Sequence, residues 1–189
     1  MEIMGISSMA YAIALFGYAT AILVISLNRF IGWSNCSDGK ESEAMRRRIA
    51  CVVLIFGSID QLSVSLILFA YFPGSYFQAT IFGAFGLLWL LVFIFDYLPL
   101  DSRYLVPVFL GFAGYTAYTG IIFYLDGSLM TAMLMWSAML FNMAFSSLTV
   151  FGSPKKLTWF IGIENSVVAY YLVLVLLILA SMNGFSLPT

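Results

Sequence analysis

The sequence contains no histidine and very few charged residues. Charged residues make up 9% of the 189 residues, hydrophobic residues make up 62%, and the mean hydropathy is +1.01. Soluble domains carry roughly 25% charged residues, so this composition excludes a soluble domain and indicates an integral membrane protein. The net charge of −1 gives no sign of nucleic acid binding. Without histidine the chain lacks the commonest metal ligand and the usual pH switch.

Motifs for catalysis are also missing. The sequence has no Walker motif, no HExxH, no CxxC and no nucleophile–base arrangement. Its two cysteines, Cys36 and Cys51, fall in a predicted loop and a predicted helix, so we expect no disulfide. The loops are too short to build an aqueous catalytic site. We therefore expect no enzymatic activity, no cofactor and no metal.

Long apolar runs dominate what is present. A helix needs about 20 apolar residues to cross a bilayer, and the runs are too long and too evenly apolar for the strands of a membrane barrel. Six spanning helices are predicted at about 9–31, 49–72, 77–98, 104–124, 129–151 and 157–182. We predict an all-α integral membrane protein in which residues 1–189 form a single six-helix transmembrane channel domain.

The basic residues set the orientation. All 8 of them fall in the breaks after the first, third and fifth spans or at the edges of these breaks. By the positive-inside rule that side is cytoplasmic, so both termini are predicted to lie outside. The chain then forms three consecutive helical hairpins in the cytoplasmic membrane, each with its basic turn inside.

Three carboxylates lie within the predicted spans. Asp96 is near the inner boundary, where we expect it to act as an interfacial cap or as a partner for Arg103. Asp60 is about half-way along its span, and Glu164 is about 10 Å into its own at 1.5 Å per residue. An acidic residue at a helix centre costs about 3 kcal/mol. Two interpretations remain open: a polar pathway, or hydrogen bonds between helices with Asn142, Ser137 or Gln61 as partners.

Aromatic and small residues give weaker signals. Phe85 and Trp89 share one helix face, and Trp136 and Leu140 share another. They are typical either of ordinary helix packing or of a narrow apolar slot. The segment GFAGYTAYTG at 111–120 has the small-residue spacing that allows close helix contact, within the bundle or between subunits.

Two segments together resemble the urea/amide channel family (AmiS/UreI). In FGLLWLLVFIFDYLPLDSRYLVPVFLGF (85–112), an aromatic–glycine pair is followed by an aromatic four residues on and by an LDxR turn. In MWSAMLFNMAF (135–145) and KKLTWFIGIENSVVAYYL (155–172), a helical tryptophan precedes a basic turn, a second tryptophan and an intramembrane Glu. The matching positions include Phe85, Trp89, Trp136 and Glu164, and the resemblance covers essentially the whole chain.

The resemblance implies a passive channel for urea or short amides. Each protomer would hold its own pore, and protomers would form a hexameric ring surrounded by membrane lipid. The implied substrate pathway comprises Trp136, Met139, Leu140, Phe85, Trp89, Glu164, Phe16, Ala19 and Leu23, with polar support from Asp60, Asn142 and Asn165. Glu164 would accept hydrogen bonds from amide NH₂ groups.

The chain departs from the family pattern in two ways. Leu140 stands where the acid-gated member has a second tryptophan, which leaves the choice between urea and amides open. Because there is no histidine, gating by histidine protonation cannot operate. Two other classes remain as alternatives: a proton-coupled small-solute transporter that uses Asp60 and Glu164 as relay sites, and a non-transporting membrane subunit of a larger complex.

Overall fold

The computed structural model describes residues 2–31, 39–98, 100–151 and 155–182. Apart from short turns between the helices, these residues are helical, and none of them forms a strand. The elements are α1 (Glu2–Ile31), α2 (Gly39–Val52), the π-helical segment η1 (Val53–Ile59), α3 (Asp60–Tyr71), α4 (Tyr76–Tyr97), the 3₁₀ turn η2 (Ser102–Leu105), α5 (Val106–Leu125), α6 (Leu129–Phe151) and α7 (Lys155–Met182). Cys36, for which no disulfide was expected, lies outside the described residues.

Six stretches of helix are long and apolar enough to cross a membrane. They are Met9–Ile31, Glu41–Tyr71, Tyr76–Tyr97, Arg103–Leu125, Leu129–Ser147 and Lys156–Leu179. The predicted all-α architecture with six spanning helices is therefore confirmed.

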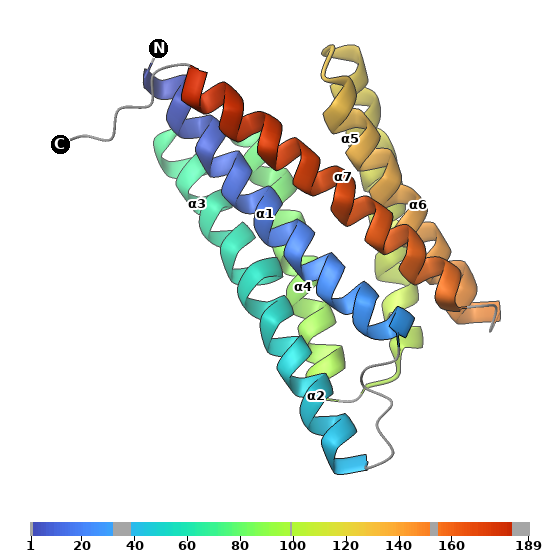
Figure 1. Ribbon diagram of the computed structural model, residues 1–189. Coiled ribbons are helices and arrows are strands. Elements are labelled where there is room, and N and C mark those ends of the chain that lie inside the picture. The colour runs from blue at the N-terminus through green and yellow to red at the C-terminus, as the bar shows by residue number, and fades with distance from the viewer. Residues whose placement is uncertain (1, 32–38, 99, 152–154, 183–189) are drawn as a thin grey trace.

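The helices form one bundle in which α1 and α7 run side by side between two helical pairs (Figure 1). On one side, α1 packs against η1 and α3, which pair with α4. On the other side, α7 packs against α6, which pairs with α5. Ring contacts between Phe85 of α4 and Phe112 of α5 join the two sides. The bundle thus has an interior bounded by all six spanning helices.

Small residues on α1 permit its central position. Ala12, Ala14, Ala19 and Ala21 are almost fully buried, and short side chains allow neighbouring helix backbones to approach closely. Gly17 is the tightest point: a Cβ built there would clash with the backbone carbonyl oxygen of Phe56 and with the carboxylate of Asp60.

The second spanning helix differs from the expected continuous α-helix. Between α2 and α3, the seven residues of η1 adopt π-helical geometry, and the N–H of Asp60 donates to the carbonyl oxygen of Ile55, five residues back. Gly57 lies within this segment, and a Cβ there would come 2.7 Å from Cγ of Trp89. Such π segments occur frequently at functional sites. In η1, Gly57 lies against the indole of Trp89 on α4, and the segment ends immediately before Asp60.

The basic residues gather at one end of the bundle, which we call the basic end: α1 has Arg29 in its last turn there, and α7 begins there at Lys155. Arg29 Nη2 pairs with Asp96 Oδ1 at 2.8 Å. The expected pairing of Asp96 with Arg103 is wrong, because Arg103 bonds Asp101 in its own turn and the side-chain hydrogen bond lowers the pKa of Asp101. The end of α1 reaches Asp96 across the bundle, which sequence spacing does not reveal.

The glycine contact on α1 yields a stability prediction. We expect Gly17→Ala to lower the free energy of unfolding by about 1–3 kcal/mol, because the new methyl group forces α1 away from η1. Gly111→Ala is the matched control, since a Cβ at Gly111 meets nothing within 4 Å. Reversible denaturation in detergent micelles measures both. Equal effects at the two glycines would show that the α1–η1 contact does not limit stability.

Candidate functional site

A cluster of aromatic side chains fills the middle of the bundle interior. We call it the interior aromatic cluster: Tyr18, Phe85, Trp89, Phe112 and Tyr115. Tyr18 meets the rings of Phe85 and Trp89 edge-on, with centroids 5.4 and 6.0 Å apart. Phe112 contacts Phe85 at 5.7 Å and Tyr115 at 6.0 Å. The five residues come from α1, α4 and α5, so the cluster ties the two sides of the bundle together.

A second group of rings continues the interior toward the basic end. Phe109 stacks on Phe145 with centroids 4.2 Å apart, and Phe141 and Phe145 both contact Trp159 at 6.2 and 6.1 Å. Phe109 lies near the start of α5, Phe145 near the end of α6 and Trp159 near the start of α7. The interior is therefore lined by aromatic groups from its middle to the basic end.

Two polar side chains bond each other beside the interior aromatic cluster. The hydroxyl of Tyr18 donates to Oδ1 of Asn165 on α7. Nδ2 of Asn165 donates in turn to the backbone carbonyl oxygen of Leu134 on α6 at 3.3 Å. Asn165 is fully buried. This short chain of hydrogen bonds fixes α1, α6 and α7 relative to one another.

Other interior polar atoms have no partner among the described residues. The indole nitrogen of Trp89 and the hydroxyl oxygen of Tyr115 are buried without a hydrogen bond. On α3, Oε1 of the buried Gln61 is also unbonded. Nearly all buried polar groups in proteins have a partner, and an orphan calls for an explanation such as bound water or a ligand. The cluster thus offers free donors within an apolar surround.

Neighbouring residues Glu164 and Asn165 point to different sides of α7. Asn165 faces the interior, whereas Glu164 is exposed on the same face as Phe160 and Val167. Oγ of Ser137 on α6 donates to Oε2 of Glu164 at 2.7 Å. Ser137 was one of the partners expected from the sequence for an intramembrane acid. Of these two neighbours, Asn165 rather than Glu164 provides a polar group to the interior.

The predicted pathway residues on α6 do not form one interior surface. Leu140 is 54% exposed, on the opposite side of α6 from Leu134 and Ala138, which are buried. Trp136 packs on α5, where its indole covers Gly120 and its ring lies 5.8 Å from that of Tyr124. The remaining two differ in burial: Met139 is half-buried and Asn142 is buried.

The predicted pathway residues on α4 and α1 also differ in burial. Phe85 and Trp89 are both buried in the interior aromatic cluster, and Ala19 is fully buried. Leu23 is half-buried, while Phe16 is 46% exposed and faces a groove on the outer side of α1. Asp60 lies on that same groove, away from Glu164, so the structure does not bring the two acids together.

Tyr18 and Tyr115 were not identified from the sequence. The candidate residues singled out from the sequence were mainly tryptophan, phenylalanine and acidic residues. Tyrosines of membrane proteins gather at the two interfaces, yet these two lie well inside their spanning helices. A tyrosine in mid-span is therefore the signal that points to them.

No group of three or more acidic or cysteine side chains that could hold a metal ion occurs among the described residues. Among the described residues, the interior offers aromatic faces, hydroxyl and amide groups and the indole N–H groups of its tryptophans. Such a surface can bind a small polar solute weakly.

Comparison with solved structures shows a likeness in fold. The structure matches that of the bacterial acetate channel SatP with a TM-score of 0.78, over 95% of this chain and 97% of that one, at 16% sequence identity. No protein-family model matches the sequence, and no curated protein matches it. At this identity the likeness establishes the fold alone.

The hydrogen bond between Tyr18 and Asn165 yields a second stability prediction. Tyr18→Phe leaves Oδ1 of the buried Asn165 without its donor, so we expect the free energy of unfolding to fall by about 1–3 kcal/mol. The control is Tyr115→Phe, which removes a hydroxyl that has no partner and should change stability by less than about 0.5 kcal/mol. Chemical denaturation in bicelles, followed by tryptophan fluorescence, compares the two. A loss for Tyr115→Phe as large as that for Tyr18→Phe would contradict the assignment.

Proposed function

We propose that the protein is a passive channel for small, flat, polar solutes: urea, short amides and the short carboxylic acids that resemble them in shape. The observation that supports this most directly is the unpartnered indole N–H of Trp89 within the interior aromatic cluster. The fold shared with an acetate channel and the resemblance to the urea/amide channel family both support it.

A solute of this kind fits the interior chemically. Its planar carbonyl or carboxyl group can lie against aromatic faces while its oxygen accepts a hydrogen bond from the N–H of Trp89 or the O–H of Tyr115. Hydrated ions cannot shed water cheaply into an apolar slot. Conduction also requires weak binding, and few polar groups are free in the described interior.

The proposed route runs through the interior of each protomer. It passes the interior aromatic cluster and continues between Phe109, Phe141 and Trp159 toward the basic end. We propose that this end faces the cytoplasm, with both termini outside, because all basic residues lie there. The route includes Phe85, Trp89 and Asn165 from the residues expected on sequence grounds and adds Tyr18 and Tyr115.

Flux through single-tryptophan variants tests the route. We expect Trp89→Phe to reduce the permeability of proteoliposomes to acetamide and urea by about 2- to 10-fold, because one neutral hydrogen bond contributes about 0.5–1.5 kcal/mol. Trp136→Phe should leave permeability unchanged, since that indole packs on α5. Stopped-flow light scattering with urea, acetamide, acetate and glycerol measures both.

Three results would count against the proposal. A loss of flux in Trp136→Phe but not in Trp89→Phe would place the route along the exposed face of α6. Uptake against a gradient that collapses with the proton gradient would indicate a proton-coupled transporter. Permeability equal to that of empty liposomes for every solute would leave a non-transporting membrane subunit as the remaining class.

We also propose that protomers associate through the exposed face of α7. Glu164 lies on this face with Phe160, Val167 and Tyr171, each of which is more than half exposed. A carboxylate that faced lipid at this depth would cost about 3 kcal/mol. A second copy of the chain that covers this face would remove Glu164 from lipid, and a homo-oligomeric ring, hexameric by the family resemblance, repeats the contact.

Cross-linking at Val167 tests the association. In a variant with Cys36 and Cys51 replaced by serine, we expect Val167→Cys to form covalent dimers with a short bis-maleimide in membranes, because this side chain is 60% exposed beside Glu164. The yield should persist when the proteoliposomes are diluted with added lipid. A yield that falls in proportion to the dilution would indicate random collision and would contradict a stable interface.

A further inference from the structure

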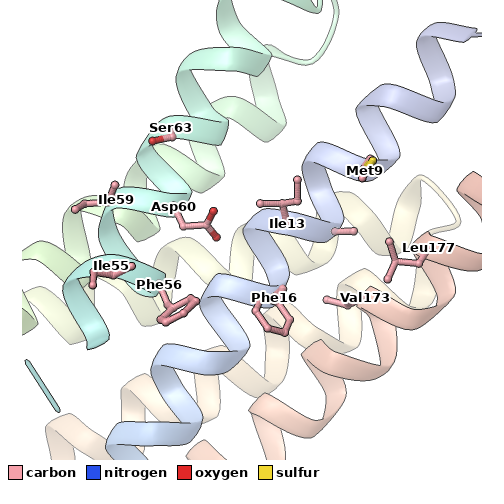
Figure 2. A pocket seen from close by; sticks show the side chains of 11 residues that line it. Met9, Ile13, Phe16, Ile55, Phe56, Ile59, Asp60, Ser63, Val173 and Leu177 are labelled. Carbon is pink, nitrogen blue, oxygen red and sulfur yellow. The ribbon is translucent and has the colours of Figure 1, made fainter. Parts of the chain in front are cut away.

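A groove on the outer side of the bundle lies outside the proposed solute route, and its mostly apolar wall contains an acidic residue. It is an open groove with a volume of about 540 Å³ between α1, η1, α3 and α7. Figure 2 shows its walls, which run from Met9 and Leu177 at one end to Phe16 and Phe56 at the other. From Met9 to Phe16 the groove follows α1 for roughly 10 Å at 1.5 Å per residue. The groove therefore extends along α1 for about two helical turns.

Aromatic side chains close the groove toward the basic end. The ring of Phe16 meets those of Phe56 and Tyr170 edge-on, with centroids 6.4 and 5.8 Å apart. The hydroxyl of Tyr170 also lies 2.8 Å from Oγ1 of Thr20, which holds Tyr170 against α1. A molecule in the groove could enter from the other end or sideways from the membrane.

Asp60 is the only charged residue among the described residues that line the groove. Its carboxylate points from α3 toward α1 (Figure 2). Oδ2 is buried over Gly17 and has no hydrogen-bond partner among the described residues. The ion pairs found in the described chain join Arg29, Arg47 and Arg103 to other acids. A buried carboxylate oxygen without a donor is costly, so the groove is chemically incomplete as it stands.

The position of Asp60 within the membrane increases the cost of its unbonded carboxylate oxygen. Asp60 lies 11 residues before Tyr71, the last residue of α3, or roughly 16 Å from that end at 1.5 Å per residue. This places the carboxylate near the middle of the membrane, where ionisable residues mark sites of function. An acyl chain of a lipid would cover the apolar walls but would bring no donor to Asp60.

We propose that the groove is a binding site for a single-chain primary amine, with its alkyl chain along Met9, Ile13 and Leu177 and its ammonium group donating to Asp60. The apolar walls match the chain, and the carboxylate matches the charge and the N–H donors of the head. A charge-assisted hydrogen bond of this kind is stronger than a neutral one. Gly17 is part of the site because only a residue without a side chain lets the carboxylate reach α1.

The site is separate from the proposed solute route. Phe16 faces the groove, whereas Tyr18, two residues later on α1, belongs to the interior aromatic cluster. A binding measurement on the groove therefore does not depend on flux, and the site can be established or refuted whatever the channel conducts.

Photolabelling of the full chain in lipid nanodiscs tests the site. The probe is an alkyl chain that carries a diazirine and a primary amine head, and its matched control is the same chain with a carboxylate head. We expect the amine probe to label residues of the groove, and Asp60→Asn to reduce that labelling by about tenfold or more, since a hydrogen bond to a charged group is lost. Ile13→Trp, which fills the groove, should abolish labelling. Ile121→Trp on α5 is the matched control, because Ile13 and Ile121 are 47% and 50% exposed.

Two further results would overturn the proposal. Equal labelling of the groove by the amine and carboxylate probes, or by the amine probe in wild type and in Asp60→Asn, would show that Asp60 selects nothing. An unlabelled groove, together with cross-linking between copies from a cysteine at position 13, would show that a second copy of the chain covers this face. Because Asp60→Asn preserves shape and Ile13→Trp leaves the carboxylate intact, agreement between the two variants separates binding from misfolding.

Discussion

The close approach of α1 to its neighbours is the constraint on which the rest of the structure depends. In lipid no hydrophobic force drives helices together, so contact distance between backbones decides packing. Buried alanines and Gly17 bring α1 against η1 and α3 on one side and α7 on the other. This position allows Tyr18 to meet Phe85 and Trp89 of α4 and, at the same time, Asn165 of α7. A bulkier α1 would separate these partners.

The same placement sorts the polar groups of the membrane region into two sets. Asn165 and the indole of Trp89 lie inside the bundle, where a solute or water can reach them only through the interior. Glu164 and Asp60 lie on outer faces, one with a hydrogen bond from Ser137 and the other with an unbonded oxygen. The interior therefore carries no described carboxylate near its middle. A neutral donor-bearing interior suits solutes that accept hydrogen bonds, and the outer acids suit partners that donate them.

The number of spanning helices could be predicted from the sequence because length and hydropathy alone determine whether a helix can cross a bilayer. Phe85 and Trp89 share a helix face, and both are indeed buried. The inward face of α6 could not be predicted, since lipid is as apolar as a protein interior and the pattern of apolar residues is the same on both sides. Leu140 and the buried Leu134 are alike in sequence but differ in exposure. The pairing of Arg29 with Asp96 and the π-helical turn before Asp60 arise from tertiary contacts, which local spacing does not encode.

The central claim is that small planar solutes pass through the interior aromatic cluster. The most direct measurement is a crystal structure of the protein soaked with selenourea, whose selenium atom is located by anomalous scattering. The account predicts an anomalous peak inside the bundle between Tyr18, Trp89 and Phe112, within hydrogen-bonding reach of the indole N–H. A peak only beside Leu140 and Glu164 on the outer face, with none in the interior, would contradict it.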